Sequence, residues 1–177
     1  SYSPSYEAAC NYLEGIMRAA GLQTRRDKIG NLFGRIEGKQ SDKTILIGSH
    51  ADTVPEAGMF DGSLGIISGI EVLQTLLQNG YKNKYAIEVV AFTEEEGLVI
   101  GGTAGSKVFS GQPLEESYIE NFQKHNINME AINSSKCDKD AILHYLELHI
   151  EQGGILEEKC KSIGIITGIV GIVRYLV

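Results

Sequence analysis

The chain has 177 residues, of which 42% are hydrophobic and 22% charged, a composition typical of a folded domain and not of a disordered or collagen-like chain. Its 16 Lys and Arg stand against 23 Asp and Glu, which gives a net charge of -7, so we expect no general surface for nucleic acid or for an anionic membrane. The three cysteines show no short pairing pattern and no charged-then-apolar leader opens the sequence, so we expect free thiols and a cytoplasmic location.

Helices and strands are predicted to alternate along the chain. Ser3 and Pro4 predict a helix start, with serine as the N-cap and proline at the first helical position, and Gly21 predicts its end. Strands are predicted at 31–36, 43–50, 85–93 and 144–150, helices at 62–78, 103–109 and 114–123, a loop at 133–135 and a short helix at 138–143. This alternation predicts an α/β layered sheet.

The segment 162–177 is almost wholly apolar but contains glycines and Arg174. It is too short to span a membrane. We expect a buried strand, or a pair of strands, that leads into further structure, and hence a chain that is a piece of a longer protein.

Charged and imidazole side chains follow three of the predicted buried strands. The groups are His50-Ala51-Asp52 with Asp61 eleven positions after His50, then Glu94-Glu95-Glu96, and then His149-Ile150-Glu151-Gln152. Taken singly, each group has a structural explanation: a hydrogen-bonded histidine, a solvated turn or a helix cap. Ligand sites gather at the carboxyl ends of strands in open α/β sheets, and buried charges need a partner or an ion. Together the groups predict a metal site, and imidazole with carboxylate suits zinc, manganese or cobalt.

The spacing within two groups suggests a division of roles. Asp52 shares a strand face with His50, so its carboxylate can hold the distal ring nitrogen of that histidine. Of two adjacent glutamates, one can bind metal while the other remains a free base. Because neighbours on a straight strand point to opposite faces, the backbone is expected to bend near Glu96 and Gly97.

These motifs, GSHADTVPEAGMFDGSLG, FTEEEG and ELHIEQGGILE in that order, resemble the di-zinc amidohydrolases typified by allantoate amidohydrolase and N-carbamoyl-L-amino-acid hydrolase, with β-ureidopropionase a relative. The resemblance begins near Leu32. It implies a three-layer αβα mixed sheet of a zinc-peptidase-like catalytic domain. Residues 1–177 would be the N-terminal portion of that domain, with about 171–177 running into a lid domain that the chain lacks. One departure is the Gly97-Leu98-Val99-Ile100 run, which lacks the arginine common in the family.

The resemblance also implies a role for each site residue. His50 and His149 would bind one ion, Asp61 would bridge two, Glu96 would bind the second, Glu95 would be the general base, Asp52 would support His50, and Gln152 would contact substrate. The expected cofactor is two divalent ions, zinc first, with manganese, cobalt or nickel as alternatives. A further histidine ligand comes from a later part of the chain in this family, so the site is expected to be incomplete here.

The activity implied is hydrolysis of a linear ureido or carbamoyl C–N bond in an N-carbamoyl-L-amino acid or allantoate. A water held between the ions would lose its proton to Glu95. We expect a small-molecule substrate, a full-length parent that is a homodimer through its lid, and no activity from this chain alone. The alternatives are an aminoacylase or dipeptidase of the same clan, against which the HIEQG motif counts, and a non-catalytic metal-binding or assembly module, which would not need a spare base. We expect His125 to be exposed and His144 to be structural.

Overall fold

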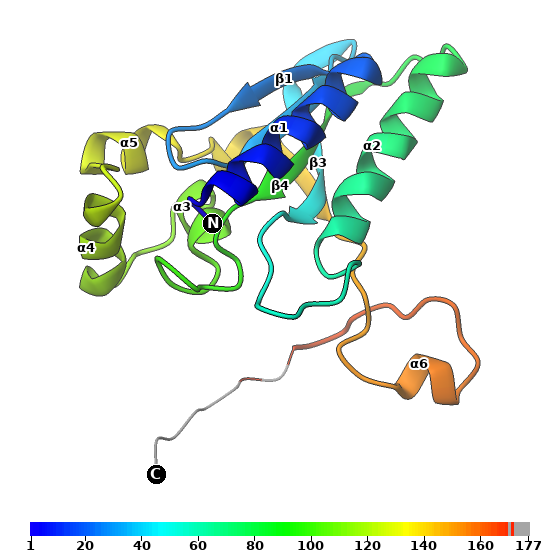
Figure 1. Cartoon of the computed structure of the whole chain (residues 1–177). Coiled ribbons are helices and arrows are strands. Elements are labelled where there is room, and N and C mark those ends of the chain that lie inside the picture. Colours follow the sequence, from blue (N-terminus) through cyan, green and yellow to red (C-terminus); the bar gives the residue numbers. More distant parts are fainter. Residues whose placement is uncertain (170, 172–177) are drawn as a thin grey trace.

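The computed structural model describes residues 1–169 and 171, and they form one mixed sheet with helices packed on it (Figure 1). The strands are β1 (Gln23–Arg26), β2 (Leu32–Ile36), β3 (Gln40–His50), β4 (Tyr85–Phe92) and β5 (Ile142–Leu146). The helices are α1 (Pro4–Ala19), α2 (Ser63–Gln78), α3 (Ala104–Phe109), α4 (Glu116–Lys124), α5 (Met129–Ser134) and α6 (Ile155–Glu158), with a 3-10 turn, η1 (Lys139–Ala141). Within the described residues, no helix is both long and apolar enough to cross a membrane.

The sheet has the order β1-β2-β4-β3-β5. β3 runs parallel to both β4 and β5, whereas β2 is antiparallel to β4 and β1 is antiparallel to β2. His50 pairs with Phe92, and Ile47 pairs with Leu146. The carboxyl ends of β3, β4 and β5 therefore meet at one edge of the sheet, where the three groups of polar residues were expected.

Helices cover both faces of the sheet, which confirms the predicted αβα arrangement. α1 and α2 pack over one face through a core that includes Met17, Leu32, Ile70 and Val89. On the other face, Phe109 of α3 packs with a second set of strand residues: Phe33, Leu46, Val90 and Phe92. A third core around Phe122 joins α3, α4 and α5.

Four local predictions were wrong. The buried strand predicted at 144–150 instead runs from Ile142 to Leu146, and residues 143–146 are exposed. β1 was missed because its sequence, QTRR, is polar, and Arg26 is held by ion pairs to Glu7 and Glu14 of α1. The predicted loop at 133–135 is mostly helical, because α5 is capped by the Asn128 side chain and buries Ile132. The predicted helix at 138–143 is only the turn η1, since β5 begins at Ile142 to pair with β3.

The apolar segment after residue 161 is also not the buried strand that we expected, as far as it is described. Ile163, Ile165, Ile166 and Ile169 have exposed fractions between 73% and 91%, and residues 162–169 have no regular secondary structure. None of the strands β1–β5 pairs with this segment. The remainder of the predicted run, at 170 and 172–177, lies outside the described residues.

Candidate metal centre

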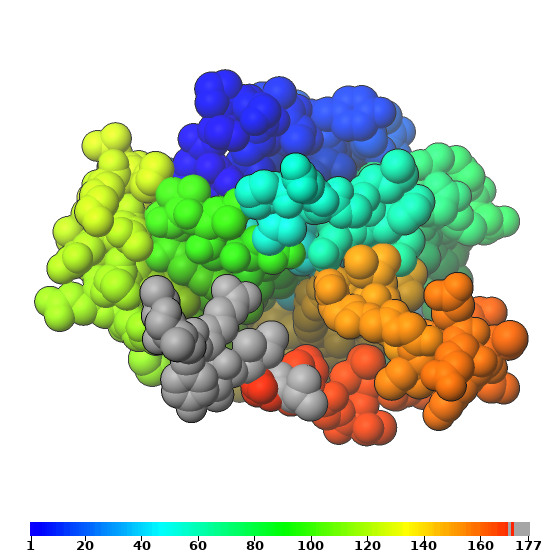
Figure 2. All heavy atoms as spheres, turned by 60° about the horizontal axis from the view of Figure 1, so that its bottom comes forward, coloured from blue at the N-terminus to red at the C-terminus, as the bar shows by residue number. Residues whose placement is uncertain are grey.

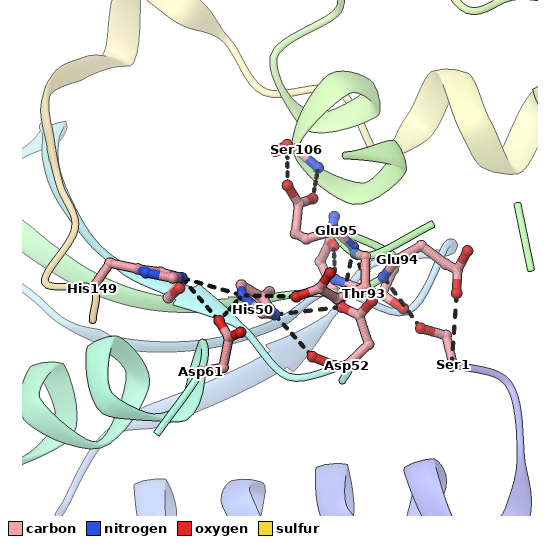
Figure 3. Close-up of polar contacts among 12 residues, drawn as sticks. Ser1, His50, Asp52, Asp61, Thr93, Glu94, Glu95, Ser106 and His149 are labelled. Atoms are coloured by element: carbon pink, nitrogen blue, oxygen red, sulfur yellow. Dashed lines mark hydrogen bonds and ion pairs between the residues drawn. The ribbon is translucent and has the colours of Figure 1, made fainter. Parts of the chain in front are cut away.

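Three segments bring His50, Asp61 and His149 together (Figure 3). His50 is the last residue of β3, Asp61 lies two residues before α2, and His149 lies three residues after β5. The Asp61 Oδ1 atom is 3.2 Å from His149 Nε2 and 3.5 Å from His50 Nε2. The two Nε2 atoms are 3.4 Å apart. The start of α2 can come this close because Gly62 lacks a side chain: a Cβ there would lie 2.6 Å from the His50 ring.

The polar atoms of this group fit a cation between them. His50 Nδ1 is 2.8 Å from the Asp52 carbonyl oxygen and His149 Nδ1 is 2.9 Å from the Ile150 carbonyl oxygen. Carbonyls only accept, so each Nδ1 carries a proton, and in the tautomer that this leaves for metal binding the Nε2 lone pair of each ring faces Asp61. Asp61 Oδ1 is buried and, among the residues that the structure describes, has no hydrogen-bond partner. Two lone pairs and a carboxylate oxygen so close together are the donor set that divalent zinc prefers.

The backbone carbonyl of Asp52 contacts His50, whereas the carboxylate of Asp52 binds the turn after β4. The carboxylate oxygen nearest to the ring is 3.9 Å from His50 Nδ1. Oδ1 instead accepts the Glu95 amide at 3.0 Å, and Oδ2 accepts the Glu96 amide at 2.9 Å. Asp52 is only 2% exposed. The carboxylate therefore fixes the turn that follows β4, a contact that the sequence did not predict.

The three consecutive glutamates point in three directions. Glu94 is fully buried, and its Oε2 accepts the amides of Val99 and Ile100 at 3.0 and 2.6 Å. Glu96 faces the histidines, with Oε1 3.9 Å from His50 Nε2. The predicted backbone bend is present: φ is +56° at Glu94 and +73° at Gly97. Glu96 is thus the glutamate that lies next to His50, whereas Glu94 binds backbone amides of the loop that follows it.

Glu95 points away from the histidines toward α3 (Figure 3). Its two carboxylate oxygens accept the backbone amide and the hydroxyl of Ser106, both at 2.8 Å. Burial raises the pKa of Glu95 to about 7, and the two bonds from Ser106 partly oppose that rise. A carboxyl group with this pKa can take up and release a proton near neutral pH, as a general base must.

The remaining sequence candidates lie around this group. Gln152 is exposed, and its Nε2 is 3.4 Å from Asp61 Oδ2. His125 is exposed and stacks on Tyr2, and His144 is an exposed residue of β5. Figure 2 shows the loop after β3 (cyan), the turn after β4 (green) and the segment after β5 (orange) meeting on one face.

Two polar residues that bind candidate site residues or their neighbours, Ser106 and Glu147, were not predicted from the sequence. Ser106 gave no signal, because one serine in a short helix resembles any other. Glu147, which accepts a hydrogen bond from Ser49, did carry a signal: it is a charged residue two positions before His149, in a segment read as a buried strand.

A fold of this kind with a His-Asp-His group at the carboxyl edge of its sheet is that of a zinc-peptidase-like domain. The model of peptidase family M28 matches residues 31–154, and the chain belongs to this family. This confirms the resemblance drawn from the three motifs.

More specific likenesses come from individual proteins. The chain is 40% identical to allantoate deiminase 2 of Glycine max, over 97% of its own length and 39% of that protein. It is 39% identical to an N-carbamoyl-L-amino acid amidohydrolase of Geobacillus stearothermophilus, over 98% of this chain and 45% of that protein. Among solved structures, a hydantoinase/carbamoylase family amidase of Burkholderia vietnamiensis superposes with a TM-score of 0.78 at 32% sequence identity. The match covers 92% of this chain and 41% of that amidase. The chain thus spans less than half the length of each of these relatives.

Proposed function

We propose that the chain is the N-terminal portion, residues 1–177, of a metal-dependent hydrolase that cleaves a linear ureido or carbamoyl C–N bond. The observation that carries the proposal is that His50 and His149 converge on Asp61. The Asp61 Oδ1 atom is buried and has no hydrogen-bond partner among the described residues. Similarity to allantoate deiminases and carbamoyl-amino-acid amidohydrolases supports the choice of bond.

Two divalent ions, zinc first, would be held by this chain and by residues from the rest of a longer protein. His50, His149 and Asp61 would hold the first ion, and Asp61 with Glu96 would contribute to the second. Bound there, the ions would supply Lewis-acid activation of a water and of the substrate carbonyl. Only two carboxylates serve the second ion, so its affinity for this chain alone would be low.

Glu95 would take the proton of the attacking water and return it to the departing nitrogen. Its pKa of about 7 suits both steps. In the structure its carboxylate is bound to Ser106, so the side chain must rotate to exchange a proton with substrate. Catalytic hydrogen bonds are often absent before substrate binds.

The substrate would be an N-carbamoyl-L-amino acid or allantoate, with Gln152 offering its amide beside Asp61. The full-length protein would form a homodimer through a lid domain. The cell compartment proposed is the cytoplasm.

The test is hydrolysis of a substrate panel by the full-length protein, loaded in turn with zinc, manganese, cobalt and nickel. We expect turnover of carbamoyl-amino acids or allantoate. Turnover of dipeptides or N-acyl amino acids alone would point instead to an aminoacylase or dipeptidase. Metal binding without turnover of any of these substrates would favour a non-catalytic module.

A further inference from the structure

His149 lies beyond the part of β5 that is fixed by sheet hydrogen bonding. The last paired residues of β3 and β5 are Ile47 and Leu146. β3 itself continues three residues further, to His50. The bond from His149 Nδ1 goes to the neighbouring Ile150 carbonyl, so it orients the ring without anchoring the segment to the sheet.

Beyond the last paired residues of β3 and β5, side-chain hydrogen bonds connect the two strands. The Ser49 hydroxyl donates to Glu147 Oε1, and the Tyr145 hydroxyl donates to Glu147 Oε2 at 2.9 Å. Ser49 is 1% exposed and immediately precedes His50. Glu147 itself is exposed, and it is two residues before His149. The Ser49–Glu147 bond therefore joins the segments that carry the two histidines, and the Tyr145 hydroxyl also lies 3.3 Å from the Gly48 carbonyl oxygen of β3.

Helix α2 supports the same segment from the other side. Gly65 lies in its first turn, and a Cβ there would lie 2.6 Å from the Leu148 carbonyl oxygen and 2.7 Å from the Ser49 Cβ. The backbone between Glu147 and His149 thus passes directly against the helix. This contact sets how near the segment lies to α2, while the Ser49–Glu147 bond connects it to β3.

We infer that Glu147 is a positioning residue for His149: through Ser49 it holds the second imidazole at the distance from His50 that an ion requires. The inference rests on the proposed ion site and assigns no contact between Glu147 and an ion. Residues that orient metal ligands in this indirect way typically contribute 10- to 100-fold to metal affinity.

The experiment measures Co²⁺ affinity of the 177-residue chain by its visible absorbance. Glu147→Ala and Ser49→Ala should each weaken binding of the first ion by about 10- to 100-fold. The Ser49→Ala/Glu147→Ala double variant should be no weaker than the worse single variant, because both changes remove the same bond. Glu147→Gln retains an acceptor for Ser49 and should recover much of the affinity. Fully additive losses, or unchanged affinity in both single variants, would overturn the inference.

The matched control is Glu151→Gln in the same motif. The Glu151 carboxylate accepts the amides of Ile155 and Leu156, each at 2.8 Å, and no hydrogen bond joins it to β3. This variant should bind Co²⁺ as the unchanged chain does. A loss equal to that of Glu147→Ala would show that any loss of charge near His149 weakens the site.

A measurement without metal separates this inference from the proposed function. The two Nε2 atoms are 3.4 Å apart, and each has the Hε1 and Hδ2 protons on its neighbouring ring carbons, so NMR should show a nuclear Overhauser contact between ring protons of the two histidines. We expect the contact in the unchanged chain and in Glu151→Gln, and its loss in Glu147→Ala and Ser49→Ala. If the unchanged chain shows the contact but binds no Co²⁺, the ion site fails and the positioning role stands. If the contact persists in both alanine variants, the positioning role is wrong whatever the ion does.

Discussion

The turn after β4 and the segment after β5 both carry candidate site residues, but they are held differently. The turn is buried at Thr93 and Glu94 and half-buried at Glu95 and Glu96. It is fixed through its backbone: Asp52 binds two amides of the turn, and Glu94 binds two more. The segment after β5 is half-buried at His149 and exposed around it, and its link to β3 is a side-chain hydrogen bond.

This difference suggests that the two regions contribute differently to one site, the turn to proton transfer and the segment after β5 to metal binding. A general base needs a low-dielectric surrounding that stays constant, because its pKa depends on that surrounding. A metal ligand can be ordered by the ion itself, since ion binding is coupled to the ordering of its ligands. We therefore expect changes in the turn to affect proton transfer and stability, and changes after β5 to affect ion affinity.

The largest expected effect is on catalysis and comes from the turn after β4. Glu95→Gln in the full-length enzyme should lower kcat by about 10²- to 10⁴-fold, because it removes the group proposed to carry the proton. Elemental analysis should find the metal content unchanged. If the variant instead loses metal while Glu96→Gln keeps it, the roles of these two glutamates are exchanged.

The next effect is on the ions. Asp61→Ala removes the oxygen that faces both histidines, so bound metal should fall at both proposed positions, with affinity for the first ion reduced by at least about 100-fold. Equilibrium dialysis followed by elemental analysis measures this directly. Asp42→Ala, an exposed carboxylate on β3, is the control. Retention of two ions per chain by full-length Asp61→Ala would remove Asp61 from the centre.

Sequence alone predicted the gathering of His50, Asp61 and His149 better than it predicted the residues that support them. β3 and β4 were recognisable because each is an apolar run followed by charged residues. β1 was not recognisable, since its polar residues are satisfied by α1. The directions of the three glutamates could not be read from their spacing, because Asp52 and Ser106, distant in sequence, determine them.

A smaller effect, on stability, tests how firmly the turn is held. Asp52→Ala would leave the part-buried amides of Glu95 and Glu96 without their acceptor, at a cost of about 1–3 kcal/mol for each unsatisfied group. We expect a total loss of about 3 kcal/mol in the free energy of unfolding, measured by urea denaturation of the metal-free chain. Glu147→Ala should cost about half as much in the same assay, because it leaves a single buried donor, the Ser49 hydroxyl, without its acceptor. Equal losses would contradict the contrast between the two regions.

The smallest effect is a shift in pH dependence within the turn. Glu95 has an ordinary pKa of 4.5 when unfolded and about 7 when folded, so the folded chain binds its proton more tightly. The stability of the metal-free chain should therefore fall as pH rises from about 4.5 to 7, with no such loss below 4.5. Ser106→Ala removes a hydrogen bond that lowers this pKa, so the fall should extend to higher pH, whereas Glu95→Gln should make the fall smaller and leave only the part due to other buried carboxyl groups such as Asp27 and Glu88. Urea midpoints between pH 4 and 8 measure all three chains, and a Ser106→Ala profile displaced to lower pH would show that the hydroxyl does not stabilise the charged carboxylate.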